Sequence, residues 1–245
     1  MKTGFLIKFI LFVLLSTAVL ITLGFILRAF DPVSSPSENA TPTSAPAYLT
    51  VIIDAGHGGE DGGAVSLAGL VEKDVNLSIA HILRDMLRAN DINVVMTRED
   101  DRLLYDKNVD YKGKKKKLDL DARIAIAEST PNAILVSIHM NSFTVSKYSG
   151  LQVWYSPNNA VSCELAELIQ NNCHEKLQPS NSRSTKVANS TIRLLNEATC
   201  PAVLVECGFL SNPEEAAMLG TQEYRQKIAF LLFCSITEFL EQSGG

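Results

Sequence analysis

Apolar residues along the chain follow two kinds of pattern, one typical of buried strands and one typical of helices. Short runs rich in Val, Ile and Leu, several of them continuously apolar as in strands covered on both faces, predict strands over Leu49–Asp54, Asn93–Arg98, Ala133–His139, Leu151–Tyr155 and Ala202–Glu206. Apolar residues at three and four spacing predict helices over Val75–Arg88, Leu118–Glu128, Glu164–Glu175 and Glu223–Phe239. This alternation indicates a single α/β domain over 48–242, with a mostly parallel twisted sheet flanked by helices.

The longest apolar run lies near the N-terminus. Between Lys8 and Arg28 the chain carries no charged side chain. At ~1.5 Å rise per residue this run matches the ~30 Å hydrocarbon thickness of a bilayer, so residues 9–28 are predicted to form a transmembrane signal anchor. A cleaved signal peptide is the alternative, although its apolar core is usually shorter and the exit residues here match a cleavage site poorly.

The charges around this run predict its orientation. Lys2 and Lys8 precede it, whereas only Arg28 follows closely. Because basic residues are retained in the cytoplasm, we expect residues 1–8 inside and the catalytic domain outside a bacterial cell membrane, anchored by a single span or secreted if the signal is cleaved. Residues 29–47 hold four prolines among Ser, Thr, Asn and Ala, which predicts a linker.

Charge and cysteine content narrow the range of partners. The chain has 27 acidic and 22 basic residues, a balance that argues against a nucleic-acid partner. The basic residues of KGKKKK lie in a stretch, Leu103–Lys117, interpreted as a solvated loop or as an electrostatic contact to an anionic wall or headgroup surface. The five cysteines form no CxxC pair and are interpreted as mostly reduced and buried.

Candidate chemistry follows the predicted strands, since functional groups of open α/β sheets gather at the carboxyl ends of strands. The first strand leads into His57, the third ends at His139, and the fifth ends at Glu206. A fourth polar residue, Glu72, opens the first helix, and the loop before this helix begins at the His57 turn. Two imidazoles and two carboxylates are therefore predicted to converge on one sheet edge.

Two histidines and one carboxylate with an open fourth position form a known set of ligands for catalytic zinc. A second carboxylate could then take the proton of the attacking water. Each residue also has a simpler interpretation when taken alone. The histidines could be satisfied core or strand-end residues, and Glu72 could complement the helix dipole. His81 and His174 fall inside predicted helices and are not expected to be ligands.

Six motifs run in order from about Leu49 to Leu240: VIIDAGHGGEDGGAV, GLVEKDVNLSIA, TRED, ARIAIA, SIHMNS and PAVLVECGFLSNPEEAAML. In these motifs the chain strongly resembles the zinc-dependent N-acetylmuramoyl-L-alanine amidases of the amidase 3 family. The resemblance implies Zn²⁺ as cofactor, His57, Glu72 and His139 as its ligands, and Glu206 as the catalytic base.

The resemblance also implies peptidoglycan as substrate, cleaved at the amide between the lactyl group of N-acetylmuramic acid and L-alanine. The anchor, TRED and the Lys-rich stretch are most similar to the spore-cortex, germination-specific members, which remove stem peptides before muramic δ-lactam forms. Without a wall-binding repeat, targeting would depend on the membrane anchor or an accessory protein. Two alternatives are a zinc peptidase acting within stem peptides and a non-catalytic wall-binding domain.

Overall fold

The computed structural model describes residues 50–105, 108 and 112–244. The predicted anchor over 9–28 and the linker over 29–47 lie outside these residues. Within the described part of the chain, no helix combines the length and the apolar character needed to cross a bilayer. The predicted anchor and its orientation therefore stay predictions.

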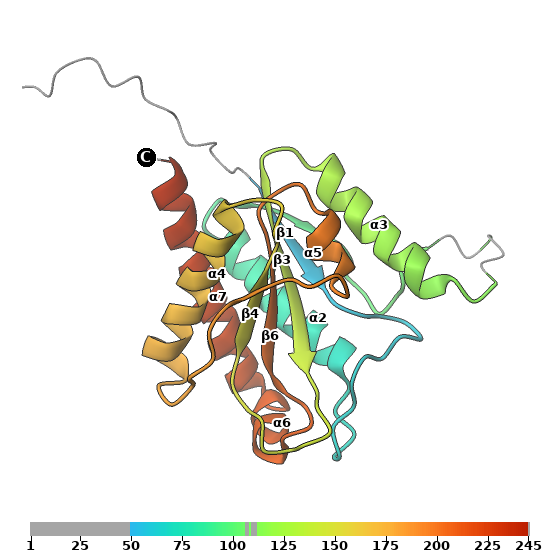
Figure 1. Ribbon diagram of the computed structural model, residues 1–245, viewed down its shortest axis with the longest axis vertical. Coiled ribbons are helices and arrows are strands. Elements are labelled where there is room, and N and C mark those ends of the chain that lie inside the picture. The colour runs from blue at the N-terminus through green and yellow to red at the C-terminus, as the bar shows by residue number, and fades with distance from the viewer. Residues whose placement is uncertain (1–49, 106–107, 109–111, 245) are drawn as a thin grey trace, which may run out of the picture. The chain divides into compact units, whose positions relative to one another are not determined.

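A six-stranded sheet forms the centre of the domain (Figure 1). Its spatial order is β2-β1-β3-β6-β4-β5. The strands span Thr50–Ala55 (β1), Asn93–Met96 (β2), Ala133–Asn141 (β3), Gln152–Tyr155 (β4), Lys186–Val187 (β5) and Ala202–Phe209 (β6). All five predicted strands are present, and β5, with two residues, is an addition that no apolar run indicated.

The sheet is mixed, so the prediction of a mostly parallel sheet is confirmed only in part. β2, β1, β3 and β6 run parallel to one another, whereas β4 is antiparallel to β6 and β5 is parallel to β4. A parallel return needs a crossover of about a dozen residues or more, usually a helix. The segment 142–151 between β3 and β4 contains no helix, so the chain turns back and β4 runs in the opposite direction.

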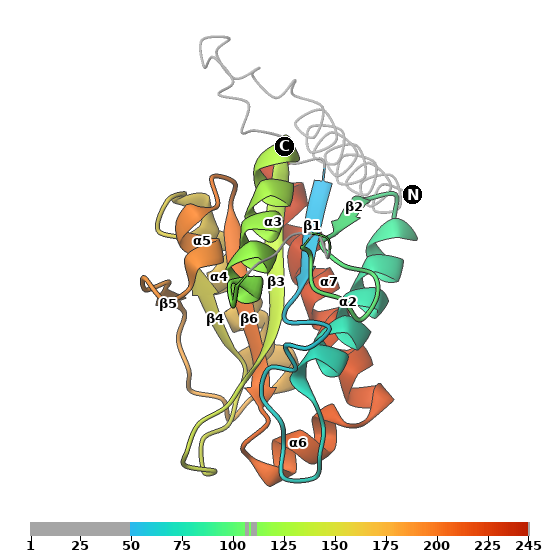
Figure 2. The same ribbon diagram turned by 90° about the vertical axis from the view of Figure 1, so that its right-hand side faces the viewer.

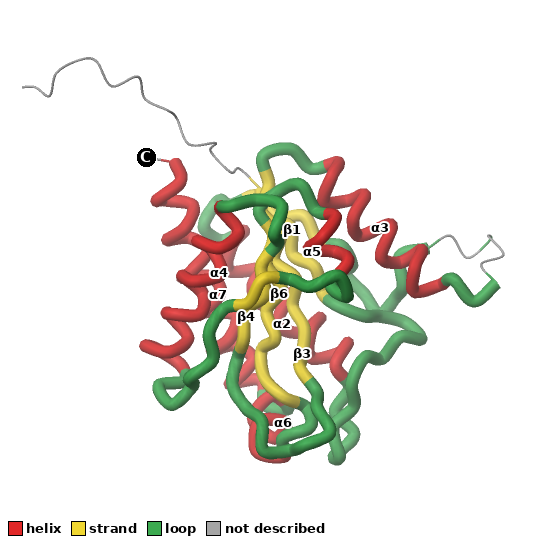
Figure 3. The backbone as a smooth tube through the Cα atoms, in the orientation of Figure 1, coloured by secondary structure: helices red, strands yellow, loops and turns green. Residues whose placement is uncertain are grey.

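Helices cover both faces of the sheet (Figures 1 and 3). On one face lie α2, α4 and α7, which span Glu72–Arg88, Val161–Asn172 and Gln222–Gly244. On the other face lie α3 (Lys115–Ser129) and α5 (Arg193–Glu197). A π-helical turn, Cys173–Leu177, continues α4, and α6 (Pro213–Leu219) follows β6. Since α3 begins at Lys115, the last three residues of the predicted Lys-rich loop are helical instead.

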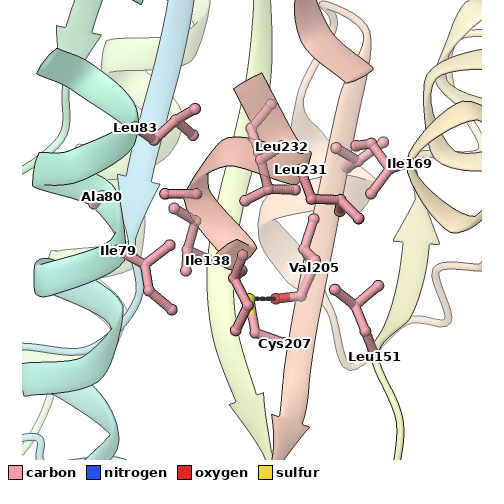
Figure 4. Close-up of a cluster of buried hydrophobic side chains, with 14 of the residues drawn as sticks. Ile79, Ala80, Leu83, Ile138, Leu151, Ile169, Val205, Cys207, Leu231 and Leu232 are labelled. Atoms are coloured by element: carbon pink, nitrogen blue, oxygen red, sulfur yellow. Dashed lines mark hydrogen bonds between the residues drawn. The ribbon is translucent and has the colours of Figure 1, made fainter. Parts of the chain in front are cut away.

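Strand alternation divides the buried side chains into two cores. The larger core lies under α2, α4 and α7, where Ile138, Val205 and Cys207 meet helix residues such as Leu83 and Leu232 (Figure 4). The smaller core lies under α3 and α5 and includes Ile52, Leu135, Leu204 and residues of the two helices. Because successive strand residues point to opposite faces, the two cores take alternate positions of the same strands.

Candidate metal centre

The face of the sheet that carries the smaller core, here called the smaller face, changes from apolar to polar along its strands. On β3 the side chains facing α3 and α5 are in turn Leu135, Ser137 and His139, and on β6 they are Leu204 and Glu206. His139 and Glu206 are direct partners in the parallel register of the two strands. The two central strands therefore present an imidazole and a carboxylate side by side, as predicted, although the strands do not end there but continue to Asn141 and Phe209.

His57 reaches the same edge from the turn that follows β1. Its backbone has φ 60°, a left-handed conformation that non-glycine residues adopt rarely. The preceding residue must be glycine for a different reason, because a Cβ atom on Gly56 would lie 2.2 Å from His139 Nε2. The turn therefore places its backbone against the His139 ring and orients the side chain of His57.

Glu72 is the first residue of α2 and enters the site from the end of the sheet. Helix α2 begins three residues before the predicted periodic run, at the position where the sequence analysis placed this carboxylate. Its Oε2 accepts a hydrogen bond from the Ala64 N–H (2.8 Å), and its Oε1 accepts one from the Met140 N–H (3.1 Å). These bonds fix a side chain that is only 4% exposed, so Glu72 does more than complement a helix dipole.

His57, Glu72 and His139 converge on one point. Glu72 Oε1 lies 3.2 Å from His57 Nε2 and 3.0 Å from His139 Nδ1. Burial opposes the ionisation of Glu72, but the contacts with His139 and His57 hold its pKa below the ordinary range. One potential ligand atom from each of the three side chains lies within 4.8 Å of the others.

This set of donors fits a divalent metal ion. Ligand atoms about 2.0–2.2 Å from such an ion lie only a few ångströms from one another, which is the spacing observed here. Among the described residues, these three form the single group of three or more His, Cys, Asp or Glu side chains with this geometry. The three predicted ligands are therefore brought together and can hold a metal.

Asp61 is a further carboxylate that contacts the cluster through His57. Its Oδ2 lies 3.0 Å from His57 Nδ1, on the far side of the ring from Glu72. Burial raises the pKa of Asp61, but the contact with His57 outweighs it and the net pKa is lowered. Metal-bound histidines usually donate their other ring N–H to such a carboxylate, which fixes the tautomer and the ring orientation. Asp61 was not among the predicted site residues, although its position four residues after His57 is a usable signal.

Glu206 has a different environment from Glu72. Its Oε2 is buried without a hydrogen-bond partner among the described residues. Burial raises the pKa of Glu206 to about 7, with opposing smaller effects from the neighbouring His139 and Glu72. An unpartnered buried carboxylate is costly and calls for an explanation. Its position beside the cluster makes it available for proton transfer.

A pocket of about 250 Å³ opens over these groups. His57, His139 and Glu206 line it together with Arg123, and its walls come from α3 and from the segment leading into α5. The wall residues combine apolar and basic side chains, namely Lys116, Leu120, Ile192, Arg193 and Leu194. The face toward α3 and α5 thus offers a cleft beside the three candidate ligands.

The remaining candidates lie elsewhere. His81 Nε2 contacts the Glu99 carbonyl at 3.0 Å, and His174 contacts Gln170; neither belongs to the cluster. All five cysteines have free thiols. Cys207 follows Glu206 but faces the larger core, where burial raises the pKa of its thiol. These histidines and cysteines are therefore not part of the candidate metal centre.

An α/β domain with a His-Glu-His cluster that can hold a metal, and with a buried carboxylate beside it, fits the class of hydrolases. The family model of N-acetylmuramoyl-L-alanine amidases matches residues 51–238. The chain belongs to this family.

Comparisons with individual proteins agree. The germination-specific N-acetylmuramoyl-L-alanine amidase of Bacillus subtilis is 34% identical over 225 residues, which cover 91% of this chain and 94% of that protein. The amidase AmiA of Escherichia coli is 30% identical, over 73% of this chain and 72% of its own length. The solved structure of the CwlD amidase from Clostridioides difficile, in complex with the GerS lipoprotein, is 37% identical with a TM-score of 0.75. It covers 79% of this chain and 99% of that one.

Proposed function

We propose that this N-acetylmuramoyl-L-alanine amidase depends on zinc, with His57, Glu72 and His139 as the ligands and Glu206 as the group that exchanges the proton. The observation that carries the proposal is the pairing of a three-donor cluster with a buried, unpartnered carboxylate oxygen beside it. Two histidines and one carboxylate leave a fourth position open, as in catalytic zinc sites.

When bound, zinc would lower the pKa of a water molecule and polarise the scissile carbonyl. Glu206 Oε2 accepts the proton of the attacking water and later donates it to the nitrogen of the leaving L-alanine. Asp61 holds the His57 ring in place through Nδ1.

The scissile bond in this proposal is the amide between the lactyl group of N-acetylmuramic acid and L-alanine. The test is digestion of purified peptidoglycan with the full chain, with and without added zinc, followed by analysis of the released termini. New L-alanine N-termini that depend on zinc support the proposal. New termini within the stem peptides would favour a zinc peptidase, and no new termini a wall-binding domain.

We further propose that the substrate is spore-cortex peptidoglycan, where peptide removal precedes formation of muramic δ-lactam. Support comes from the Bacillus subtilis relative, which is named for germination. Deletion of the gene in a spore-forming host should leave cortex without muramic δ-lactam, as measured by muropeptide analysis. Normal δ-lactam content after deletion would contradict this role.

Membrane attachment through residues 9–28, with the catalytic domain outside the cytoplasm, completes the proposal. An accessory lipoprotein is a candidate partner, because the solved Clostridioides difficile neighbour is in complex with one. Protease added to intact protoplasts should degrade the catalytic domain while a cytoplasmic marker survives. Protection of the domain until lysis would contradict the proposed orientation.

A further inference from the structure

Two arginines lie in the interior of the domain next to the metal-binding residues. Arg98, which follows β2, is 1% exposed, and Arg123 in α3 is 3% exposed. Arginine is almost never fully buried unless its charge is paired or its donors are satisfied. Both guanidinium groups point at one short piece of backbone, the turn 55–57 that carries His57 (Figure 2 shows β1, β2 and α3 around this turn).

Arg123 uses all of its donors at this place. Nη2 donates to the His57 carbonyl at 2.8 Å, and Nη1 donates to the Ala55 carbonyl at 2.8 Å and to Asp54. Nε donates to Asp119 Oδ2 at 2.8 Å, and the second Nη2 hydrogen reaches Asp119 Oδ1. A guanidinium has five N–H groups in a planar fork, and each has an acceptor here.

Arg98 binds the same turn from the other side. Nε donates to the Ala55 carbonyl at 2.8 Å, and Nη2 donates to the Gly56 carbonyl at 3.0 Å. Nη2 also donates to the Lys73 carbonyl at 2.8 Å, in the first turn of α2 next to Glu72. Arg98 therefore connects the turn that carries one ligand to the helix start that carries another.

The three successive carbonyls of Ala55, Gly56 and His57 are thus all held by guanidinium groups. His57 needs such restraint, because its left-handed φ is unfavourable for a residue with a side chain. Asp54 and Asp119, both buried, form ion pairs with Arg123, whereas Arg98 donates only to backbone carbonyls. The result is a hydrogen-bonded network that fixes the backbone from which the His57 ring projects.

We propose that Arg123 and Arg98 are positioning residues for the metal centre, which hold His57 and the start of α2 in the conformation that binds the metal. The inference rests on the proposed metal site. Neither arginine is among the ligands, and both act through backbone carbonyls. Lysine cannot replace them, because an ammonium group offers three donors from a single point and cannot span the same acceptors.

The test uses the full chain and its Arg123→Lys and Arg98→Lys variants. The zinc dissociation constant is measured by competition with a chromophoric chelator, and the visible spectrum is recorded after loading with Co²⁺. We expect each variant to bind zinc about 10–100-fold more weakly, the usual effect of losing a partner that orients a ligand. The Co²⁺ absorption bands should shift because the donor geometry changes.

Leu83→Ala is the control for general destabilisation. Leu83 lies in the larger core and takes no part in the arginine network, so its truncation weakens folding without removing any hydrogen bond of the network. It should keep the zinc affinity of the unmodified chain. Equal loss of affinity in Leu83→Ala, or undiminished affinity in folded Arg123→Lys and Arg98→Lys, overturns the positioning role.

A milder change covers the case in which neither lysine variant folds. Asp119→Asn leaves every carbonyl contact of Arg123 possible but removes the charge that orients the guanidinium. It should weaken zinc binding several-fold, and unchanged affinity would count against the proposal. An unmodified chain that binds no zinc contradicts the proposed function itself. Zinc binding by the unmodified chain with no loss in the variants contradicts only the positioning role.

Discussion

The two faces of the sheet use the same strands for different purposes. Toward α2, α4 and α7 the strand residues are apolar over their whole length, as in Ile134, Val136 and Ile138 of β3. Toward α3 and α5 the same strand presents Leu135, then Ser137, then His139. On one face β3 is packed against apolar side chains along its full length. On the other face the residues toward the carboxyl end of β3 are polar.

Both faces contribute apolar packing, but only the face toward α3 and α5 also carries the polar groups of the candidate site. The larger core supplies apolar packing along the full length of the central strands. The smaller face can then carry groups that are expensive to bury, such as the unpartnered Oε2 of Glu206. Substitutions on the two faces should accordingly affect different measurements.

Glu206→Gln should give the largest effect and the clearest separation. The amide keeps the shape of the side chain but cannot accept the proton of water, so kcat should fall by about 10²–10⁴-fold. Zinc content, measured by atomic absorption, should stay at that of the unmodified chain. Stability should not fall, because a desolvated carboxyl group is replaced by a neutral one. An active Glu206→Gln chain would remove Glu206 from the mechanism.

Leu83→Ala tests the opposite face. Leu83 is fully buried in the larger core, and its truncation should lower the free energy of unfolding by about 2–5 kcal/mol. Below the unfolding transition kcat should not change.

Leu204→Ala is the matched variant on the other face, since Leu204 belongs to the smaller core and lines the pocket. That variant should change KM, and unchanged KM would weaken the division between the faces.

Gly56→Ala should damage the site with little effect on the core. The added Cβ would lie 2.2 Å from His139 Nε2, so the ring or the turn must move. A displacement of this size should reduce activity by about 10²-fold and weaken zinc binding in the same assay. Gly62→Ala in the same loop is the matched control, because its Cβ would meet only the Val71 Cγ1 at 3.3 Å. Equal losses in both variants would contradict the steric explanation.

The pH dependence of stability should report on Asp54, on the smaller face. Burial raises the pKa of Asp54, but the charge of Arg123 and hydrogen bonds from Ser137 and Thr97 lower it to about 2 from 3.8. Because the folded pKa is the lower one, the stabilisation is complete above about pH 4 and is lost as the pH falls through 2. Its size is about 2 kcal/mol. Urea unfolding between pH 2 and 7 should show this slope, and Asp54→Asn should reduce it.

The sequence predicted the central strands from strong local patterns, whereas the roles of the four candidate site residues came from their predicted convergence together with the family resemblance. Continuous apolar runs marked β1, β3 and β6, and the polar residues after them marked the edge where His57, His139 and Glu206 meet. Helix α6 was missed because seven residues are too few for a periodic signal. Its start was nevertheless encoded, since Asn212 caps the helix and Pro213 occupies the first position.

The direction of β4 and the buried arginines could not be predicted in the same way. A strand pattern is equally compatible with either direction, and only the short connection from β3 decides it. In a pattern of hydrophobic and polar positions, charged residues are taken as exposed, so Arg98 and Arg123 would be assigned to the surface. Their burial depends on three carbonyls of the turn 55–57. A tertiary arrangement of this kind produces no periodic pattern in the sequence from which it could be predicted.

The alternation on β3 and β6 also restricts how these strands can change in length. Removing one residue between Leu135 and His139 would turn His139 toward the larger core and bring an apolar neighbour into the pocket. Removing two would keep each side chain on its own face and only shorten the distance to the catalytic edge. Insertions and deletions that preserve the enzyme should therefore occur in pairs within these strands, whereas the loops beyond them can vary by single residues.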